Sequence, residues 1–293
     1  MSVTALHAHL KTGETTVCQC WAVTRSDGAV FGFTDHDCAL EFEGITFRAD
    51  SGMSARALAA STGLSVDNSE ALGLLRSDVL TEEDIAAGRY DGAEVRNWLV
   101  NWQKPGQRQL RFRGTIGEIT RQAGQFEAEL RGLAEKLNQP QGRSFLKTCS
   151  AVLGDAQCGF DLSDPAYSAT GEAAGVAENR SLRLDATGFQ DRWFEEGRLT
   201  VLSGKAKGLS GIIKHDRKDG ARRHLTLWHA LRAPLANGDR VRIEAGCDKR
   251  AATCREKFAN FVNFRGFPDI PGDDWLMAVP RSSDDSDGGS LLR

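Results

Sequence analysis

Four of the chain's seven cysteines form two widely separated pairs, and they are the residues best suited to do chemistry. Eight residues separate Cys149 from Cys158, six separate Cys247 from Cys254, and 88 lie between the pairs. Four thiolates suit either a tetrahedral zinc ion or a [4Fe–4S] cluster. The pairing therefore predicts one inorganic centre, provided that the fold brings both pairs together.

Spacing alone does not choose between the two centres. Zinc ligands usually stand roughly two to four residues apart within a pair, and neither interval here matches. A cluster is larger than one ion and spreads its ligands further apart, so wider intervals suit it better. A third interpretation is four buried cysteines that act as small apolar side chains. The residues by themselves leave zinc and the cluster equally favoured.

Residues beside the cysteines fit a bound centre. Gly159 follows Cys158 and Gly246 precedes Cys247, and glycine suits a backbone that must turn around an object. Nearby cationic side chains would offset the negative charge of thiolates; these are Lys249, Arg250, Arg255 and, at the first pair, Lys147.

The strongest signal for an enzyme lies in residues 34–38, which read TDHDC. Asp35, His36 and Cys38 would supply a carboxylate, a base and a thiol nucleophile for a hydrolase acting on cell wall or peptide. No third group that would orient the base can be identified. Asp side chains also favour turns, because they bond to their own backbone. We therefore interpret the stretch as a structural turn, predict no enzyme, and keep the hydrolase as the alternative function.

The bulk composition is that of a soluble globular protein. The chain has 293 residues, 40% of them hydrophobic, and a net charge of −3. This charge disfavours general nucleic-acid binding, which needs a basic surface. No apolar run is long enough for a membrane span, and no secretory signal is recognisable. We expect synthesis in the cytosol, where cysteines do not form a disulfide framework. Cys18, Cys20 and Cys38 are interpreted as core or surface thiols.

Two groups of short strands must position the cysteine pairs. Residues 17–133 alternate apolar and polar side chains between turns, with a hairpin loop at 122–124 and a short helix capped by Thr81. In the strand around Trp98, both faces carry large apolar groups, which predicts burial on two sides. Residues 131–142 are predicted to form a second short helix that Pro140 ends.

After Pro140 the pattern predicts a small barrel or sandwich and then a helix over 251–264. Because antiparallel strands return the chain to its starting point, this β domain would bring both cysteine pairs beneath one barrel. The predicted fold is mainly β (α+β), with a β-rich domain at 1–140, a four-cysteine β domain at 141–280 and a disordered tail at 281–293. The four barrel strands are predicted near 198–203, 209–215, 222–229 and 239–244.

Several long motifs resemble a phage-conserved tail-hub family found in siphophages and gene transfer agents. They include CWAVTRSDGAVFGFTDHDCALEFEGITF, which begins at Cys20, and GCDKRAATCREKFANFVNFRGFPDIPG, which begins at Gly246. The resemblance covers residues 17–280. The cysteine-bearing part is also similar to that of the lambda tail-tip protein L, which carries an iron–sulfur cluster.

The resemblance implies a structural baseplate hub that serves DNA delivery. Three copies are expected below the ring of distal tail protein, seating the central fibre or penetration protein, without sequence-specific nucleic-acid contact. The chain would be made in the bacterial cytoplasm and assembled into the tail tip. The family's four cysteines correspond to Cys149, Cys158, Cys247 and Cys254, which favours a [4Fe–4S] cluster over zinc.

Overall fold

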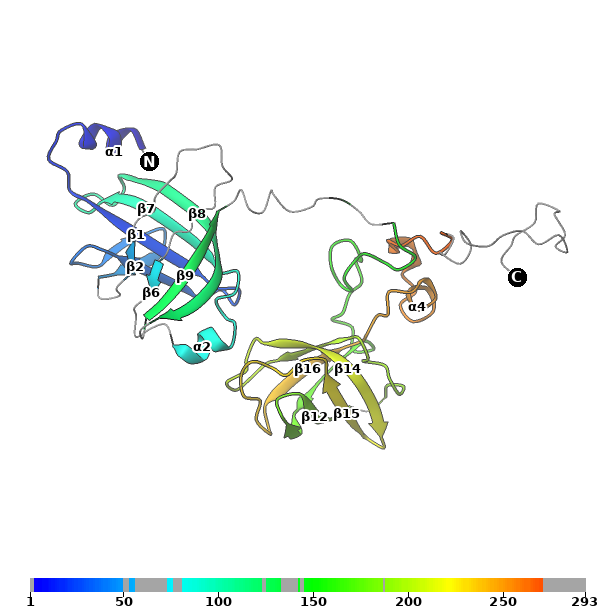
Figure 1. Cartoon of the computed structure of the whole chain (residues 1–293). Coiled ribbons are helices and arrows are strands. Elements are labelled where there is room, and N and C mark those ends of the chain that lie inside the picture. The colour runs from blue at the N-terminus through cyan, green and yellow to red at the C-terminus, as the bar shows by residue number, and fades with distance from the viewer. Residues whose placement is uncertain are drawn as a thin grey trace, which may run out of the picture.

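The computed structural model describes residues 3–49, 53–55, 73–75, 81–122, 125–132, 142, 145–186 and 188–270. Two β-sheets and a few short helices account for its regular structure (Figure 1). The expectation of a mainly β chain with few helices is confirmed. Within these ranges no helix is both long and apolar enough to cross a membrane.

The first sheet has nine strands in the order β3-β4-β2-β1-β7-β8-β9-β6-β5. Neighbouring strands in this sheet pair antiparallel, except that β2 and β4 run parallel to each other. The predicted hairpin is confirmed, since Gln122 of β8 pairs with Gln125 of β9. The strands are β1 Val17–Thr24, β2 Val30–Thr34, β3 Leu40–Phe42, β4 Ile45–Arg48, β5 Met53–Ala55, β6 Gly73–Leu75, β7 Glu94–Asn101, β8 Arg108–Gln122 and β9 Gln125–Gly132.

Both faces of this sheet carry a core, as the sequence predicts for β7. Val95 packs with Trp21 and Ile116 in one cluster, while Trp98 packs with Phe47 in another. A register shift in the pairing of β7 with β8 falls between Asn97 and Trp98. The Trp98 side chain is only 3% exposed, so it belongs to the core.

Two helices accompany the first sheet. In α2, Glu82–Ala86, the Thr81 hydroxyl accepts the Asp84 N–H at 3.2 Å, which confirms the predicted cap. Helix α1, Val3–Leu10, is absent from the sequence prediction. Leu6 anchors it in full burial, and the Thr16 backbone N–H donates to His9 Nε2 at 3.0 Å.

The second sheet has seven strands and is nearly closed into a barrel. Its order is β10-β16-β13-β14-β15-β12-β11. The two halves of the sheet face each other closely, because a Cβ on Gly171 of β10 would lie 2.6 Å from Leu184 of β12. The strands are β10 Ser168–Glu172, β11 Ala174–Ala177, β12 Ser181–Asp185, β13 Arg198–Val201, β14 Ser210–Asp219, β15 Arg222–Leu227 and β16 Arg240–Glu244.

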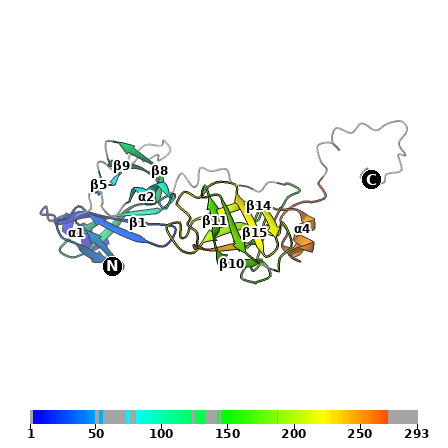
Figure 2. The same ribbon diagram turned by 90° about the horizontal axis from the view of Figure 1, so that it is seen from below.

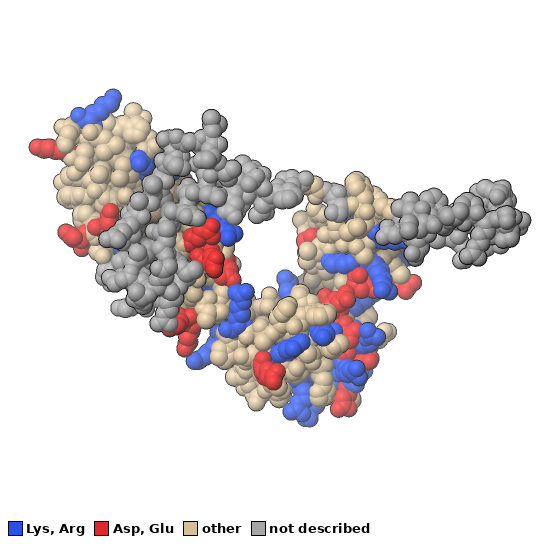
Figure 3. All heavy atoms as spheres, viewed as in Figure 1, with Lys and Arg blue, Asp and Glu red and all other residues tan. Residues whose placement is uncertain are grey.

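The four predicted barrel strands are confirmed as β13 to β16, whereas β10 to β12 are additional. The enclosed core consists of aliphatic side chains and Phe194. On the face that Figure 3 shows, Lys and Arg are interspersed with Asp and Glu over this half of the chain. That face therefore lacks the single-sign stripe that non-specific nucleic-acid binding requires.

The end of α2 touches the barrel (Figures 1 and 2). Ala87 is buried with the barrel core, and Arg232 Nη1 donates to the Asp91 carboxylate at 2.6 Å. Arg89 also donates to the Lys205 carbonyl at 2.8 Å. The two sheets therefore contact each other through a small, largely polar junction, and the domain boundary near residue 140 stays a prediction.

Among the described residues, which end at 270, the last regular elements are α4, Ala251–Glu256, and the 3-10 turn η1, Phe261–Asn263. The predicted helix over 251–264 is too long, because Ala259 takes a positive φ of 48° and ends the helical path. In the predicted helix over 131–142, residues 131 and 132 end β9, and 133–141 lie outside the described residues. So does the tail at 281–293.

Candidate cofactor site

Cys149, Cys158, Cys247 and Cys254 line one small cavity, with a volume of about 20 Å³. Strand pairing explains why such distant residues meet. Ser168 at the start of β10 pairs with Glu244 at the end of β16. The segment before β10 and the segment after β16 therefore leave the barrel side by side. We call residues 145–167 and 246–270 together the cysteine module.

Backbone bonds hold the first pair in place. The Cys149 N–H donates to the Lys249 carbonyl at 2.8 Å, which joins the two cysteine segments. The Asp155 carboxylate accepts the N–H groups of Val152, Gln157 and Cys158 at 2.8, 2.9 and 2.7 Å. These bonds, that of Cys158 first, hold the pKa of Asp155 below its usual range. Asp155 thus fixes the turn that presents Cys158.

The two glycines serve different purposes. Gly159 has a φ of +63°, the left-handed conformation that a turn after Cys158 requires. Gly246 is needed for close approach, because a Cβ there would lie 1.5 Å from the Glu195 carbonyl oxygen. Because this clash would be with a backbone atom, no movement of a side chain could relieve it.

Replacing Gly246 with Ala is therefore expected to push the Cys247 segment away from the barrel. The free energy of unfolding of this variant should fall by about 1–3 kcal/mol, the usual cost of overpacking. Urea denaturation of the full chain measures this loss. Gly106→Ala is the control, since a Cβ on Gly106 would meet nothing within 4 Å. Equal stability of the Gly246→Ala and Gly106→Ala variants would contradict the requirement for glycine at position 246.

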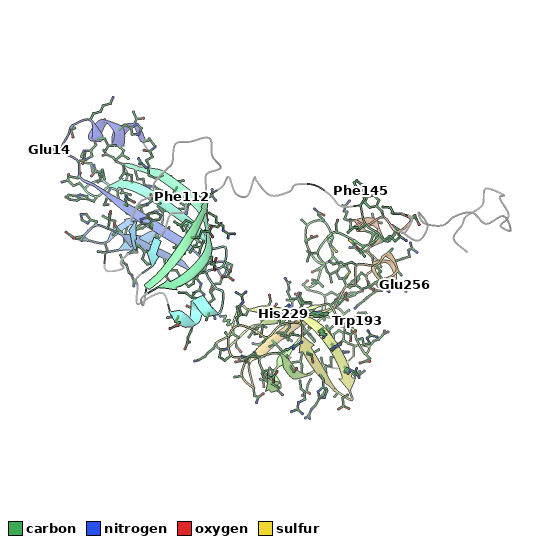
Figure 4. The ribbon with its side chains drawn as sticks, viewed as in Figure 1. Glu14, Phe112, Phe145, Trp193, His229 and Glu256 are labelled. Carbon is green, nitrogen blue, oxygen red and sulfur yellow. The ribbon has the colours of Figure 1, made fainter. Side chains whose placement is uncertain are left out.

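Aromatic rings and one lysine attach the cysteine module to the barrel. Phe258 stacks on Tyr167 with ring centroids 5.6 Å apart, and Trp193 lies at the barrel end nearest the module (Figure 4). Lys257 Nζ donates to the carbonyls of Trp193 and Gly246 at 2.6 and 2.9 Å. Burial lowers the pKa of Lys257. The carbonyl just before Cys247 is thus held by a half-buried ammonium group.

The thiols oppose one another's ionisation. Burial raises the pKa of Cys254, and the charges of Cys247, Cys149 and Cys158 raise it further. Burial also raises the pKa of Cys247, although the Lys249 N–H and its charge act in the opposite direction. Four neighbouring thiolates would need a compensating positive centre, and a metal centre supplies that charge.

The predicted cationic neighbours have different roles. Lys249 Nζ donates to the Ala151 carbonyl at 2.5 Å, so it ties the two cysteine segments together. Arg250 lies 3.8 Å from the Asp248 carboxylate, and Arg255 lies over the Phe261 ring at 4.4 Å. Only Lys249 acts on a thiol among the interactions described for these side chains.

Two N–H groups point at sulfur atoms. The Arg265 backbone N–H donates to Cys149 Sγ at 3.4 Å, and the Asn260 side-chain amide donates to Cys158 Sγ at 3.5 Å. Such bonds are typical of thiolate ligands and stabilise their negative charge. Asn260, Lys257 and Arg265 were not predicted as site residues from the sequence. A polar Asn within the aromatic run FANFVNF was the available signal.

The described residues contain no group of three or more His, Cys, Asp or Glu side chains that could hold a metal ion. The structure therefore does not support an iron–sulfur site as part of the fold, and that expectation stays a prediction. The donor set by itself suits either centre, because four thiols line one cavity, and both a zinc ion and a [4Fe–4S] cluster take four thiolate ligands.

The hydrolase candidate does not assemble. The Asp35 carboxylate accepts the Gln19 backbone N–H at 2.7 Å, and His36 Nδ1 accepts the Cys38 backbone N–H at 3.0 Å. His36 also lies against Trp102, with ring centroids 4.9 Å apart. The three groups thus serve a local turn. Cys38 is exposed, and Cys18 and Cys20 are buried in the core of the first sheet.

Two family models match the chain. Residues 3–161 match the N-terminal attachment domain of baseplate hub proteins, and residues 192–274 match the phage conserved hypothetical protein BR0599 family. A solved chain from the virion of a native gene transfer agent particle is 54% identical, with a TM-score of 0.88. The match covers 99% of this chain and 100% of that one. No curated protein matches.

Proposed function

This chain belongs to the baseplate hub protein family, and we propose that it joins the tail tube to the central tip protein of a phage-like particle. In this proposal, three copies lie below the distal tail ring and hold the central fibre or penetration protein. The chain is synthesised in the bacterial cytoplasm and incorporated into the tail tip, where it serves DNA delivery. Its role is structural, not enzymatic.

The single observation that carries this proposal is the full-length similarity to a gene transfer agent virion chain. A TM-score of 0.88 over 99% of the chain extends to both sheets and to the cysteine module. Because both parts are arranged alike in the two chains, we expect them to occupy the same place in their particles. The two-sheet architecture also suits a hub, because each sheet can contact a different neighbour.

The proposal is tested in particles assembled with and without the chain. Deleting it is expected to leave filled heads and tails that lack a tip and deliver no DNA, and expression in trans should restore delivery. Cryo-electron microscopy of tagged particles should place three copies at the end of the tail tube. Density for the tag anywhere else, or intact tips without the chain, would contradict the proposal.

We further propose that Cys149, Cys158, Cys247 and Cys254 hold a [4Fe–4S] cluster, with zinc as the alternative. The support is that the four thiols line one cavity and that N–H groups point at two of the sulfurs. When bound, the cluster would cross-link the two halves of the cysteine module. Its binding energy would then contribute to folding.

A further inference from the structure

Asn260 is not a cysteine neighbour in sequence, yet it contacts two of the four cysteine residues. Its side-chain amide donates to the Cys158 carbonyl at 2.7 Å as well as to Cys158 Sγ at 3.5 Å. Its backbone N–H donates to the Cys254 carbonyl at 3.0 Å. One residue therefore bridges the segment before the barrel and the segment after it.

The orientation of this amide is fixed by a second asparagine. Asn263 Nδ2 donates to Asn260 Oδ1 at 2.7 Å, so the oxygen of Asn260 is occupied and its NH₂ group is directed at Cys158. The turn itself is set by Ala259, whose φ is +48°, and by η1, which begins at Phe261. Asn260 is thus held in place by its own backbone and by its neighbour.

Resting on the proposed cluster, we infer that Asn260 is a positioning residue that sets the reduction potential and the stability of the bound centre. An N–H group directed at a ligand sulfur stabilises the more negative, reduced state of a cluster and so raises its reduction potential. The same hydrogen bond stabilises the Cys158 thiolate as a ligand and so slows the loss of metal from it. The second bond of the same amide, to the Cys158 carbonyl, keeps it in place.

Anaerobic reconstitution of the full chain tests this inference. Asn260→Ala and Asn260→Asp are expected to shift the reduction potential to more negative values in a redox titration followed by electron paramagnetic resonance. Asp should have the larger effect, because it replaces the donor by a negative charge. Iron release to a chelator should become about tenfold faster, the change expected from losing one hydrogen bond to a charged group.

Gln157→Glu is the matched control. It adds the same negative charge next to Cys158 in sequence, on an exposed side chain for which only a backbone N–H bond to Asp155 is described. Its potential and iron release should stay close to those of the wild type. Asn260→Ser is a second variant of smaller volume that allows the potential to be measured if Asn260→Asp does not retain a cluster.

The outcomes separate this inference from the proposal on which it rests. A wild-type chain that binds no iron–sulfur cluster overturns both, and it does so without any variant. A wild-type chain with a cluster, together with Asn260 variants that behave like Gln157→Glu, overturns only the role of Asn260. A shift in potential confined to the Asn260 variants supports it, because a purely structural role would leave the potential of the retained cluster unchanged.

Discussion

Replacing Cys247 with Ser is expected to abolish the iron content of the anaerobically purified chain, which should otherwise hold about four iron atoms. The broad visible absorbance of the cluster should disappear with the iron. Cys247 is the first cysteine after the barrel, and it faces the same cavity as the other three thiols. Removal of one ligand of four leaves an open position from which the centre is lost.

The same variant should lose the fold of the cysteine module but not that of the first sheet. The module has few large buried side chains of its own, because among its described apolar residues only Ala151 and Phe258 are buried. Limited proteolysis should therefore cut within 145–167 and 246–270 and leave the β1–β9 sheet intact. Chelation of the wild-type cofactor should produce the same cleavage pattern.

Cys38→Ser is the control for both measurements, since Cys38 is exposed and does not line the cavity. It should keep its iron and its protease resistance. A Cys247→Ser chain that retains wild-type iron would contradict the ligand assignment. A colourless wild-type chain with one zinc ion would contradict the cluster, while the hub function would remain possible.

Replacing Asp216 with Asn should destabilise the barrel by about 3–5 kcal/mol, the usual cost of leaving one charge of a buried pair without its partner. Asp216 and Arg223 are both 0% exposed, and Arg223 Nη1 lies 2.6 Å from each carboxylate oxygen. The Asp216 carboxylate also accepts the Phe194 N–H at 2.9 Å. The Arg223 guanidinium lies over the Phe194 ring at 4.9 Å. Water therefore cannot reach it to compensate for the lost charge of the Asp216 carboxylate.

A neighbouring pair, which joins β15 to β12 instead of to β14, is the control. Arg222 lies 3.5 Å from Asp185, and both side chains are mostly exposed. Such surface pairs contribute at most about 1 kcal/mol, so Asp185→Asn should have little effect in urea denaturation of the full chain. Comparable losses in the two variants would show that the buried pair does not stabilise the barrel in this way.

The strands with clear alternation were predictable from sequence, and those without it were not. In β15 the apolar residues Leu225 and Leu227 alternate with polar ones, which is the pattern of a half-buried strand. By contrast, β10 and β11 consist mostly of Gly, Ala, Ser and Thr. Small side chains carry little periodicity, and these strands exist because pairing with β16 and β12 satisfies their backbone.

The candidate site was predictable only in part. The four cysteines and their convergence at one end of the barrel were predictable from residue type and antiparallel topology, whereas the strand that pairs with β16 to bring them together, β10, was not. Asn260 and Lys257 could not be identified, because each acts through bonds to partners distant in sequence, at Cys158 and Trp193. The end of α4 was also unpredictable, since a non-glycine residue at positive φ, here Ala259, leaves no signal in composition.

The order of segments along the chain determines how mechanical load would pass through the C-terminal half. The chain runs from the first segment of the cysteine module into the barrel, and from the barrel into the second segment. The barrel lies between, and its two ends are paired with each other at Ser168 and Glu244. Tension between the two segments of the module would be borne across the bond from Cys149 to Lys249 and, with the proposed centre bound, across its four cysteine ligands. The barrel would stay outside this load path and keep its shape while the module is pulled.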